Sequence, residues 1–295
     1  MPDSAFVPLA LAAADGARAA VLPYGAHLVS WTPAPGAPGG ADERLFVSRR
    51  AEYRAGAAVR GGVPVIFPQF SDVVAGPGPS IRHGFARTRP WRVVRTERAA
   101  DGAAEAVLAL ADADLDADTR ARWPHPFRAE LRVRVAGATL AVTLAVENTG
   151  DAPFAFTGAL HTYLRAGDAA AARARGLEAA PARDNAAAGA PRPPLGTPLG
   201  FGAEVDHLYP RVPGPVTLDD PALGRATRAE QTGFPDVVVW NPGPARGAAL
   251  ADLEPDGWRR FACVEAAAAE PVTVAPGARW DGAQCLTCVP FGGGA

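Results

Sequence analysis

His161 is the first residue of this chain whose type and position could do chemistry. It lies in GALHTYLRAGD (158–168), a segment that otherwise has the pattern of a buried β-strand. Because successive strand residues point to opposite faces, His161 and Tyr163 share one face, whereas Leu160 and Leu164 share the other. The bulky apolar face predicts packing into a core, and the face with the histidine predicts the floor of a ligand cleft. A half-buried histidine with satisfied hydrogen bonds is the alternative.

Glu265 is the second candidate, in RRFACVEAAAAE (259–270), where it follows Cys263 and Val264 in an apolar strand. A carboxylate is costly to bury without a partner, and burial raises its pKa and strengthens it as a base. A glutamate at a sheet edge in water is the alternative. If Glu265 and His161 converge in one cleft, on opposite sides of a hexose-sized hollow, they could act as a general base and a general acid.

Two shaped loops carry further polar candidates. In VRGGVPVIFPQF (59–70), two glycines free the backbone and two prolines stiffen it, so Arg60 is expected on a fixed loop. In IRHGFARTRPW (81–91), three polar residues surround a glycine: Arg82, His83 and Arg87. Together these loops could bind the hydroxyls of a sugar or a phosphate. Ordinary surface arginines are the alternative.

The composition is that of a globular protein with a sizeable core, with 295 residues, 48% hydrophobic and 20% charged. The formal net charge is −2, and every basic side chain is arginine because the chain has no lysine. An anion site must therefore use guanidinium groups, which grip carboxylate or phosphate through two parallel hydrogen bonds. No arginine-rich block has the density of a nucleic-acid-binding surface, so no nucleic-acid partner is expected.

The sequence favours a cytoplasmic protein. The N-terminal MPDSAFVPLALAAADGARAAVLP has no basic region before its apolar patch and predicts a first strand and turn instead of a signal peptide. No apolar run approaches the roughly 18 residues that span a bilayer, so no membrane partner is expected. Cys263, Cys285 and Cys288 are expected to be reduced and buried in strands. The C-x-x-C spacing of the last two, without a second pair or a nearby histidine, is a weak zinc signal.

Strand patterns dominate the elements that must position these residues. LRVRV (131–135) alternates strictly, ATLAVTLAVENTG (138–150) continues the period of two, and DVVVW (236–240) is apolar throughout, as in a strand covered on both faces. RFACVEAA and QCLTCV are further candidate strands, and Gly-Pro turn signals separate the runs. The alanine-rich 168–191 predicts a loop with a short strand. We therefore expect one all-β antiparallel sandwich domain over residues 1–295.

At this point the combination of motifs resembles a known family. RGGVPVIFPQF, RHGFAR, GALHTYLRAGD, VDHLYP, VVVWNP and DGWRRFACVEAA occur in the order seen in the D-hexose-6-phosphate mutarotases. These form the glucose-6-phosphate 1-epimerase branch of the aldose 1-epimerase (galactose mutarotase-like) superfamily. The likeness runs from about residue 20 to the C-terminus, and several motifs in register are far more specific than any one of them. The resemblance implies an antiparallel β-supersandwich.

The resemblance also implies roles for individual residues. His161 matches the general acid of the family and Glu265 its general base. His83 and Asp206 match residues that contact the sugar, and Arg60 and Arg87 match arginines implicated in anion or phosphate binding.

The chain departs from the family pattern at two positions near the expected cleft. Gly243 stands where the family usually has a bulky aromatic residue, and Arg246 stands where a lysine is common. These departures bear on the rim of the cleft and leave the His161–Glu265 pair untouched. The remaining histidines, His27, His125 and His207, are expected to be structural or at the surface.

The activity implied by the resemblance is interconversion of the α and β anomers of an aldohexose 6-phosphate. Glu265 would take the proton of the C1 hydroxyl while His161 donates one to the ring oxygen, and closure with reversed roles would give the other anomer. Only protons move, so no metal or redox cofactor is expected, and the partner is a small sugar phosphate bound by a monomer. Two alternatives are a mutarotase for unphosphorylated aldoses and a non-catalytic carbohydrate-binding sandwich.

Overall fold

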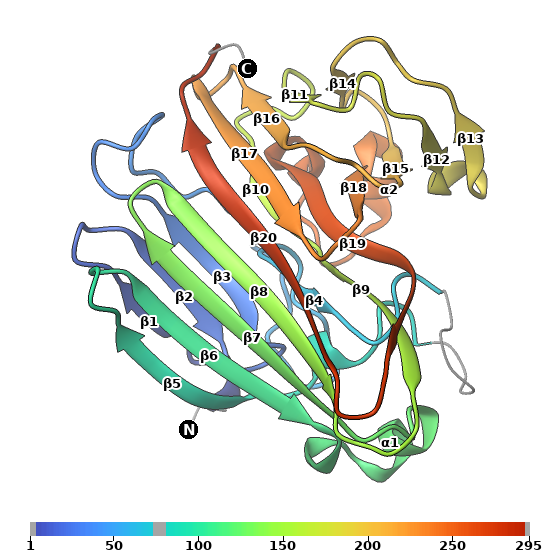
Figure 1. Ribbon diagram of the computed structural model, residues 1–295. Coiled ribbons are helices and arrows are strands. Elements are labelled where there is room, and N and C mark those ends of the chain that lie inside the picture. Colours follow the sequence, from blue (N-terminus) through green and yellow to red (C-terminus); the bar gives the residue numbers. More distant parts are fainter. Residues whose placement is uncertain (1–3, 73–80, 293–295) are drawn as a thin grey trace.

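Strands make up most of the computed structural model, which describes residues 4–72 and 81–292 (Figure 1). Within these residues there are two short α-helices, α1 (Ala117–Arg122) and α2 (Gly243–Ala249). The 3₁₀ turns are η1 (Ser4–Phe6), η2 (Ala86–Thr88), η3 (Asp112–Asp114), η4 (Asn185–Ala187) and η5 (Gly257–Arg260). No helix in the described part is long and apolar enough to cross a membrane.

The strands form three antiparallel sheets. The smallest has the order β1 (Leu9–Ala12), β2 (Arg18–Leu22), β3 (His27–Thr32). The eight-stranded sheet has the order β13 (Ala190–Arg192), β12 (Ala182–Asp184), β15 (Val205–Tyr209), β18 (Asp236–Asn241), β19 (Phe261–Val274), β9 (Phe154–Leu160), β4 (Val65–Ile66), and β10 (Tyr163–Arg165) also pairs with β19. The nine-stranded sheet has the order β14 (Leu199–Gly200), β11 (Arg173–Arg175), β16 (Val216–Asp220), β17 (Arg225–Thr232), β20 (Arg279–Val289), β8 (Thr139–Asn148), β7 (Phe127–Ala136), β6 (Ala104–Ala111), β5 (Arg92–Arg98).

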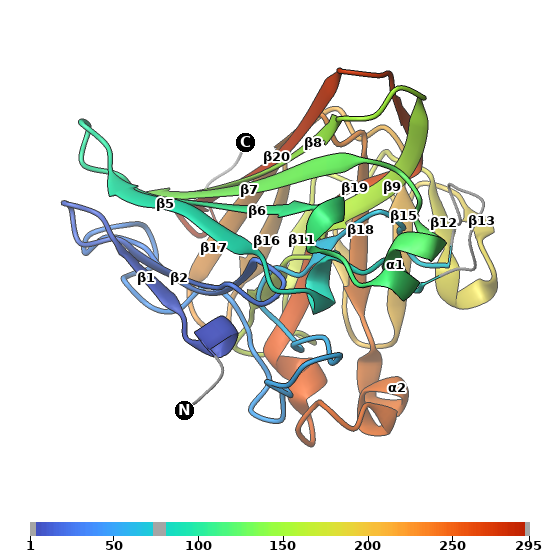
Figure 2. The ribbon, with the colours of Figure 1, turned by 90° about the horizontal axis from the view of Figure 1, so that it is seen from below.

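The two large sheets lie as facing layers, with the small sheet beside the end that carries β5 and β6 (Figures 1 and 2). One large cluster of buried side chains fills the space between them, with members such as Trp31 from the small sheet, Leu131 from the nine-stranded sheet and Phe156 from the eight-stranded sheet. This arrangement confirms the predicted antiparallel β-supersandwich.

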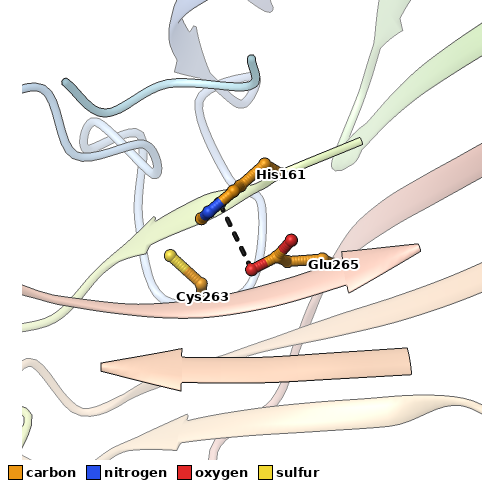
Figure 3. Close-up of side chains that lie close together, drawn as sticks. All are labelled: His161, Cys263 and Glu265. Atoms are coloured by element: carbon orange, nitrogen blue, oxygen red, sulfur yellow. Dashed lines mark ion pairs between the residues drawn. The ribbon is translucent and has the colours of Figure 1, made fainter. Parts of the chain in front are cut away.

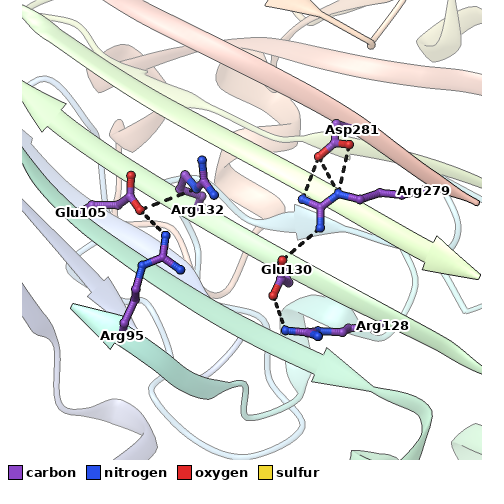
Figure 4. Close-up of polar contacts among 7 residues, drawn as sticks. All are labelled: Arg95, Glu105, Arg128, Glu130, Arg132, Arg279 and Asp281. Carbon is purple, nitrogen blue, oxygen red and sulfur yellow. Dashed lines mark hydrogen bonds and ion pairs between the residues drawn. The ribbon is translucent and has the colours of Figure 1, made fainter. Parts of the chain in front are cut away.

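One face of the nine-stranded sheet packs on the core, and the other faces solvent. Along β7, alternate residues such as Leu131 and Val133 are buried, which confirms the predicted alternation of 131–135. The opposite face carries ion pairs, some between different strands and some between residues two apart on one strand (Figure 4). These are Arg95–Glu105 at 2.7 Å, Arg132–Glu105 at 3.7 Å, Arg128–Glu130 at 2.5 Å, Arg279–Glu130 at 3.1 Å and Arg279–Asp281 at 2.9 Å.

The eight-stranded sheet is covered on both faces. All six residues of β18 are buried, as predicted from the apolar run at 236–240. On β19, Val264 and Ala266 belong to the large core, whereas Cys263 and Ala267 belong to two smaller clusters on the other face. Glu265 shares this second face, which loops and α2 cover, and it is here that a site can form.

Most of the other strand predictions are confirmed, with two corrections. The segment 168–191 holds the short strands β11, β12 and the start of β13 between loops, as expected. The predicted single strand through Leu164 is interrupted, because β9 ends at Leu160 and β10 begins at Tyr163. The three cysteines are free and lie in strands, but Cys285 is only partly buried.

Candidate active site

His161 and Glu265 face each other across neighbouring strands. Leu160 of β9 pairs with Ala266 of β19, so the next residue along β9, His161, stands opposite Glu265 in the same antiparallel register. The amide of His161 donates to the carbonyl of Pro64 at 3.0 Å, which fixes the backbone from the other side. Directly opposed residues of an antiparallel pair point to the same face, so both side chains leave the sheet together.

The interruption between β9 and β10 is held from the core side by buried polar groups. The hydroxyl of Thr162 lies 2.5 Å from the side-chain oxygen of Gln284 on β20, and the Gln284 amide donates to the carbonyl of Val264 at 3.0 Å. The amide of Val264 in turn donates to the carbonyl of Thr162 at 3.1 Å. These bonds satisfy buried polar atoms and fix the backbone next to His161.

The imidazole Nδ1 of His161 lies 3.3 Å from Oε1 of Glu265 (Figure 3). Burial raises the pKa of Glu265 well above its ordinary value, and the carboxylate of Asp206 raises it further. Burial lowers the pKa of His161 well below 6.5, and the electrostatic effects of the neighbouring His83 ring, Arg87 and Arg60 add to this. Both shifts favour the uncharged side chain, so the pair holds a single proton near neutral pH.

One cavity of about 540 Å³ contains every site residue expected from the sequence. These residues are Arg60, His83, Arg87, His161, Asp206 and Glu265. The expected placement of the pair on opposite sides of a hexose-sized hollow is wrong, since His161 and Glu265 lie side by side in its lining.

Arg60 is held firmly on the cavity wall. Its Nη1 donates to the hydroxyl of Tyr163 at 3.0 Å, and its Nε and Nη2 both lie 3.1 Å from Oδ2 of Asp252. The loop that carries Arg60 needs glycine at position 62, where φ is +63° and an added Cβ would lie 2.1 Å from the carbonyl oxygen of Leu28. The predicted fixed loop is therefore present.

Arg87 differs from Arg60 in having no carboxylate partner among the described residues. Its Nη2 donates to the carbonyl of Arg82 at 3.1 Å, and its buried Nε has no hydrogen-bond partner in the described part. Burial lowers the pKa of Arg87 to about 10, so it stays charged at neutral pH. The other arginines that line the cavity are paired: Arg60 with Asp252, Arg82 with Asp72 at 2.6 Å, and Arg246 with Glu204 at 2.6 Å.

His83 lies next to His161 in a conformation that is uncommon for residues other than glycine. Its φ is +64°, and its amide donates to the carbonyl of Ser71 at 2.8 Å. The His83 ring lies 5.8 Å from the ring of His161, edge to face. Burial and the nearby arginine charges lower the pKa of His83 to about 3, so it is neutral. Its Nδ1 accepts a hydrogen bond from the amide of Ser71 at 3.3 Å, which leaves Nε2–H as the free donor.

Asp206 lies on β15 at the far side of the cavity floor. It accepts a hydrogen bond from Nδ2 of Asn185 at 2.9 Å, and burial raises its pKa. The two departures from the family pattern meet at the rim beside it. Gly243 has φ of +62° and its missing Cβ would lie 2.5 Å from the amide nitrogen of Glu204, so no aromatic residue fits this backbone. Arg246 extends over the rim to Glu204.

The comparison with known families now decides the class of this site. The family model of the aldose 1-epimerases matches residues 9–287. The chain belongs to the aldose 1-epimerase family. It is therefore an isomerase that interconverts the anomers of a sugar.

Individual relatives support the family assignment over nearly the whole chain. A protein of Cenchrus ciliaris with the name "Putative glucose-6-phosphate 1-epimerase" is 32% identical over 288 residues, which cover 93% of this chain and 83% of that protein. An Escherichia coli (strain K12) protein of the same name is 33% identical over 256 residues, covering 85% and 79%. The crystal structure of a "putative mutarotase (YeaD)" from Salmonella typhimurium superposes with a TM-score of 0.81 at 29% identity, covering 93% and 88%.

Two aromatic side chains of this epimerase complete the cavity around His161. Tyr163 stacks on the His161 ring with centroids 4.8 Å apart and an interplanar angle of 11°, and Trp240 meets both rings edge to face. The alternation of the sequence predicts that Tyr163 shares a face with His161. The sequence does not predict Trp240 or Asp252 as site residues, because Trp240 ends a uniformly apolar run and Asp252 lies in a loop without a pattern.

A larger groove of about 740 Å³ lies elsewhere in the epimerase, next to Phe46. Two of its carboxylates are engaged, since Asp168 accepts two bonds from Arg259 at 3.1 Å and Glu254 accepts a 2.6 Å bond from Ser48. Among the described residues, its lining holds no histidine or cysteine. The smaller cavity is therefore the candidate site.

Of the remaining histidines, His27 is fully buried, with Nε2 lying 2.6 Å from the carbonyl of Gly61. His125 packs on Trp123, and His207 is buried beside Asp184. None of the three lines the cavity.

Proposed function

We propose that this epimerase interconverts the α and β anomers of an aldohexose 6-phosphate, with Glu265 as general base and His161 as general acid. The names of the Cenchrus ciliaris and Escherichia coli relatives point to glucose 6-phosphate as the substrate to test first. The cavity lining supports the proposal, because it combines an acid–base pair with an excess of guanidinium charge.

The distance between the two groups suits this reaction. The hydroxyl oxygen and the ring oxygen that must exchange protons are both bonded to C1, so the base and the acid must also lie close together. Nδ1 of His161 and Oε1 of Glu265 are 3.3 Å apart and open onto the same cavity. One hexose ring resting on this floor can therefore meet both groups at once.

The proton count is also consistent. With the shared proton on His161, the Glu265 carboxylate accepts the C1 hydroxyl proton as the imidazolium protonates the ring oxygen, and the C1–O5 bond breaks. The open aldehyde then faces a neutral carboxylic acid and a neutral imidazole, which is the state that burial favours. After rotation about C1–C2, the same two protons return in the opposite sense and the ring closes as the other anomer.

Arg87 is the observation that favours a phosphorylated sugar. Three of the four arginines that line the cavity have a carboxylate partner, whereas Arg87 has none among the described residues. A buried guanidinium without a counter-charge is costly, and a phosphate dianion would supply that charge. Arg60, 3.0 Å from the Tyr163 hydroxyl, would then add a second donor next to the His161 ring.

His83 and Asp206 are proposed to hold the sugar hydroxyls. His83 is neutral, and its Nδ1 accepts from the amide of Ser71 at 3.3 Å, so Nε2 carries the proton and can donate to a hydroxyl without adding charge beside Arg87. Asp206 is free to accept from a hydroxyl, since its single described hydrogen bond comes from Asn185.

NMR exchange spectroscopy on separate samples of glucose 6-phosphate, glucose and galactose tests this proposal. We expect accelerated exchange between the anomers of glucose 6-phosphate. Exchange confined to the free sugars would refute the phosphate specificity and favour a mutarotase for unphosphorylated aldoses. A chain that binds these sugars without accelerating any exchange would be a carbohydrate-binding sandwich.

A further inference from the structure

Cys263 brings a third donor atom to the acid–base pair (Figure 3). A sulfur, a ring nitrogen of His161 and a carboxylate oxygen of Glu265 all lie within 4.8 Å of one another, and all three residues are buried. In the close-up the thiol and the carboxylate both rise from β19 toward the imidazole. The proposed reaction makes no use of this thiol.

Two atoms of this cluster make no hydrogen bond within the described part of the chain, although one of them, Nδ1 of His161, lies 3.3 Å from Oε1 of Glu265. Nδ1 of His161 and Oε2 of Glu265 are buried and have no hydrogen-bond partner among the described residues. The residues His161 and Glu265 are 8% and 2% exposed. Buried polar atoms are nearly always satisfied, so two open lone-pair donors beside a thiol indicate a place for a ligand that accepts electron pairs.

The strands place the three donors with little freedom. Cys263 and Glu265 are two positions apart on β19 and therefore share a face. Cys263 pairs with Trp240 on one side and with Tyr163 on the other, which fixes the backbone of β19 in the middle of the sheet. A tetrahedral zinc ion with bonds of about 2.0–2.3 Å keeps its ligand atoms roughly 3.3–3.8 Å apart. The 3.3 Å between Nδ1 and Oε1 already fits, and the sulfur, within 4.8 Å of both other donor groups, would need to move closer.

We propose that Cys263, His161 and Glu265 form a binding site for one Zn²⁺ ion, and that a bound zinc ion switches the isomerase off. Thiolate, imidazole and carboxylate are the three ligand types that zinc takes from proteins, and three of them leave a fourth position open toward the cavity. On binding, the ion displaces the thiol proton and the proton shared by the pair. A thiolate and a carboxylate then balance its two positive charges, so the filled site is neutral.

The charges that face this site from other elements partly offset one another. Arg60 is paired with Asp252, whereas Arg87 is unpaired in the described part and opposes a cation. Asp206, on β15, adds a negative charge close enough to Glu265 to raise its pKa. The inhibition rests on the proposed roles of His161 and Glu265, whereas the binding of zinc does not.

The binding is tested on the full chain with Cd²⁺ as a spectroscopic substitute for Zn²⁺. We expect a thiolate-to-cadmium charge-transfer band in the ultraviolet that saturates at one ion per chain and is removed by competing Zn²⁺. Cys263→Ser should lose the band and bind Cd²⁺ at least about 100-fold more weakly. Removing a residue that only orients a metal ligand already weakens metal affinity by up to about 100-fold, and Cys263 is a ligand itself. Cys285→Ser, which removes a partly buried thiol on another strand, should keep it.

Two further variants keep the test decisive. Cys263→Ala covers the case in which a serine hydroxyl is poorly tolerated at this buried position, and Glu265→Gln should weaken cadmium binding while leaving the thiol in place. A band that persists in Cys263→Ser or Cys263→Ala, or an affinity unchanged in Glu265→Gln, would overturn the site.

The inhibition is measured as anomer exchange with and without Zn²⁺, each variant relative to its own metal-free rate. Zinc should stop exchange by the unmodified chain, a chelator should restore it, and Cys263→Ser should need at least about 100-fold more zinc. Equal inhibition of Cys263→Ser would refute the switch. If no sugar is turned over at all, the proposed function fails, whereas the cadmium titration still decides the metal site.

Discussion

Nδ1 of His161 lies 3.3 Å from Oε1 of Glu265, because the antiparallel register of β9 and β19 sets the two residues directly opposite each other. A hundred residues of chain separate them, yet their relative position depends on one pair of neighbouring strands in the middle of a sheet. The proposed acid–base pair is therefore as rigid as the sheet itself, which is the condition for proton transfer without reorganisation.

Replacing the base tests this pair most directly. Glu265→Gln keeps the shape of the side chain but removes its ability to take a proton. We expect anomer exchange to fall by about 10²–10⁴-fold while sugar binding stays largely intact. NMR exchange gives the rate and calorimetry the affinity, and full activity in this variant would remove Glu265 from the mechanism. Glu254→Gln, at a buried glutamate in the separate groove, is the control and should exchange at close to the original rate.

The proposed contact between Arg87 and the phosphate of the substrate predicts a change in KM. Arg87→Gln removes a charge that has no carboxylate partner in the described part of the chain. Since a hydrogen bond to a charged group contributes about 1.5–3 kcal/mol, we expect the KM for glucose 6-phosphate to rise roughly 10- to 100-fold, with a much smaller change in kcat.

The matched control for this experiment is Arg246→Gln. Arg246 lines the same cavity but is already paired with Glu204, and its side chain is 40% exposed. Its removal should change the KM less than about fivefold. If the two variants raised the KM equally, overall positive charge and not Arg87 would be responsible.

The faces of the strands were predictable from the sequence because side-chain direction alternates strictly along a strand. His161 and Tyr163 lie on one face and Leu160 on the core face, even though the strand is interrupted between Leu160 and Tyr163. The alternation survived because the residues on both sides of the break keep the same partner strand, β19.

The register between strands could not be predicted from the sequence. For this reason the expected placement of His161 and Glu265 on opposite sides of the hollow is wrong. Which residue faces which depends on contacts between segments a hundred residues apart, and alternation carries no information about them. For the same reason, the sequence did not predict that Trp240 and Asp252 line or support the cavity. Asp252 lies in a loop, and its role is to pair with Arg60, which is 3.1 Å away only in the folded chain.

His27 predicts a pH dependence of stability. Burial lowers its pKa from 6.5 to about 4, and Nε2 carries the proton because it lies 2.6 Å from the carbonyl of Gly61. The unfolded chain therefore binds a proton below about pH 6.5 that the folded chain refuses until about pH 4. This stability is complete above pH 6.5 and is lost as the pH falls through that window, by up to about 3 kcal/mol.

His27→Gln should remove this contribution, because glutamine can donate to the same carbonyl and does not titrate. The free energy of unfolding, measured with urea at a series of pH values, should decline less steeply between pH 6.5 and 4 in the variant. His125→Gln, at a less buried histidine, should change the slope less. Parallel curves for the unmodified chain and His27→Gln would show that His27 is not the group responsible.

Gly62 should be one of the least replaceable residues near the site. It has φ of +63°, and an added Cβ would lie 2.1 Å from the carbonyl oxygen of Leu28 and 2.9 Å from Nε2 of His27. Gly224 has nearly the same φ, +58°, with no atom within 4 Å of its missing Cβ. Gly224→Ala should therefore cost only the left-handed conformation, about 1 kcal/mol, whereas Gly62→Ala must also displace β3 and should cost at least about 3 kcal/mol. Urea midpoints compare the two, and equal losses would mean that the loop carrying Arg60 can move aside without strain.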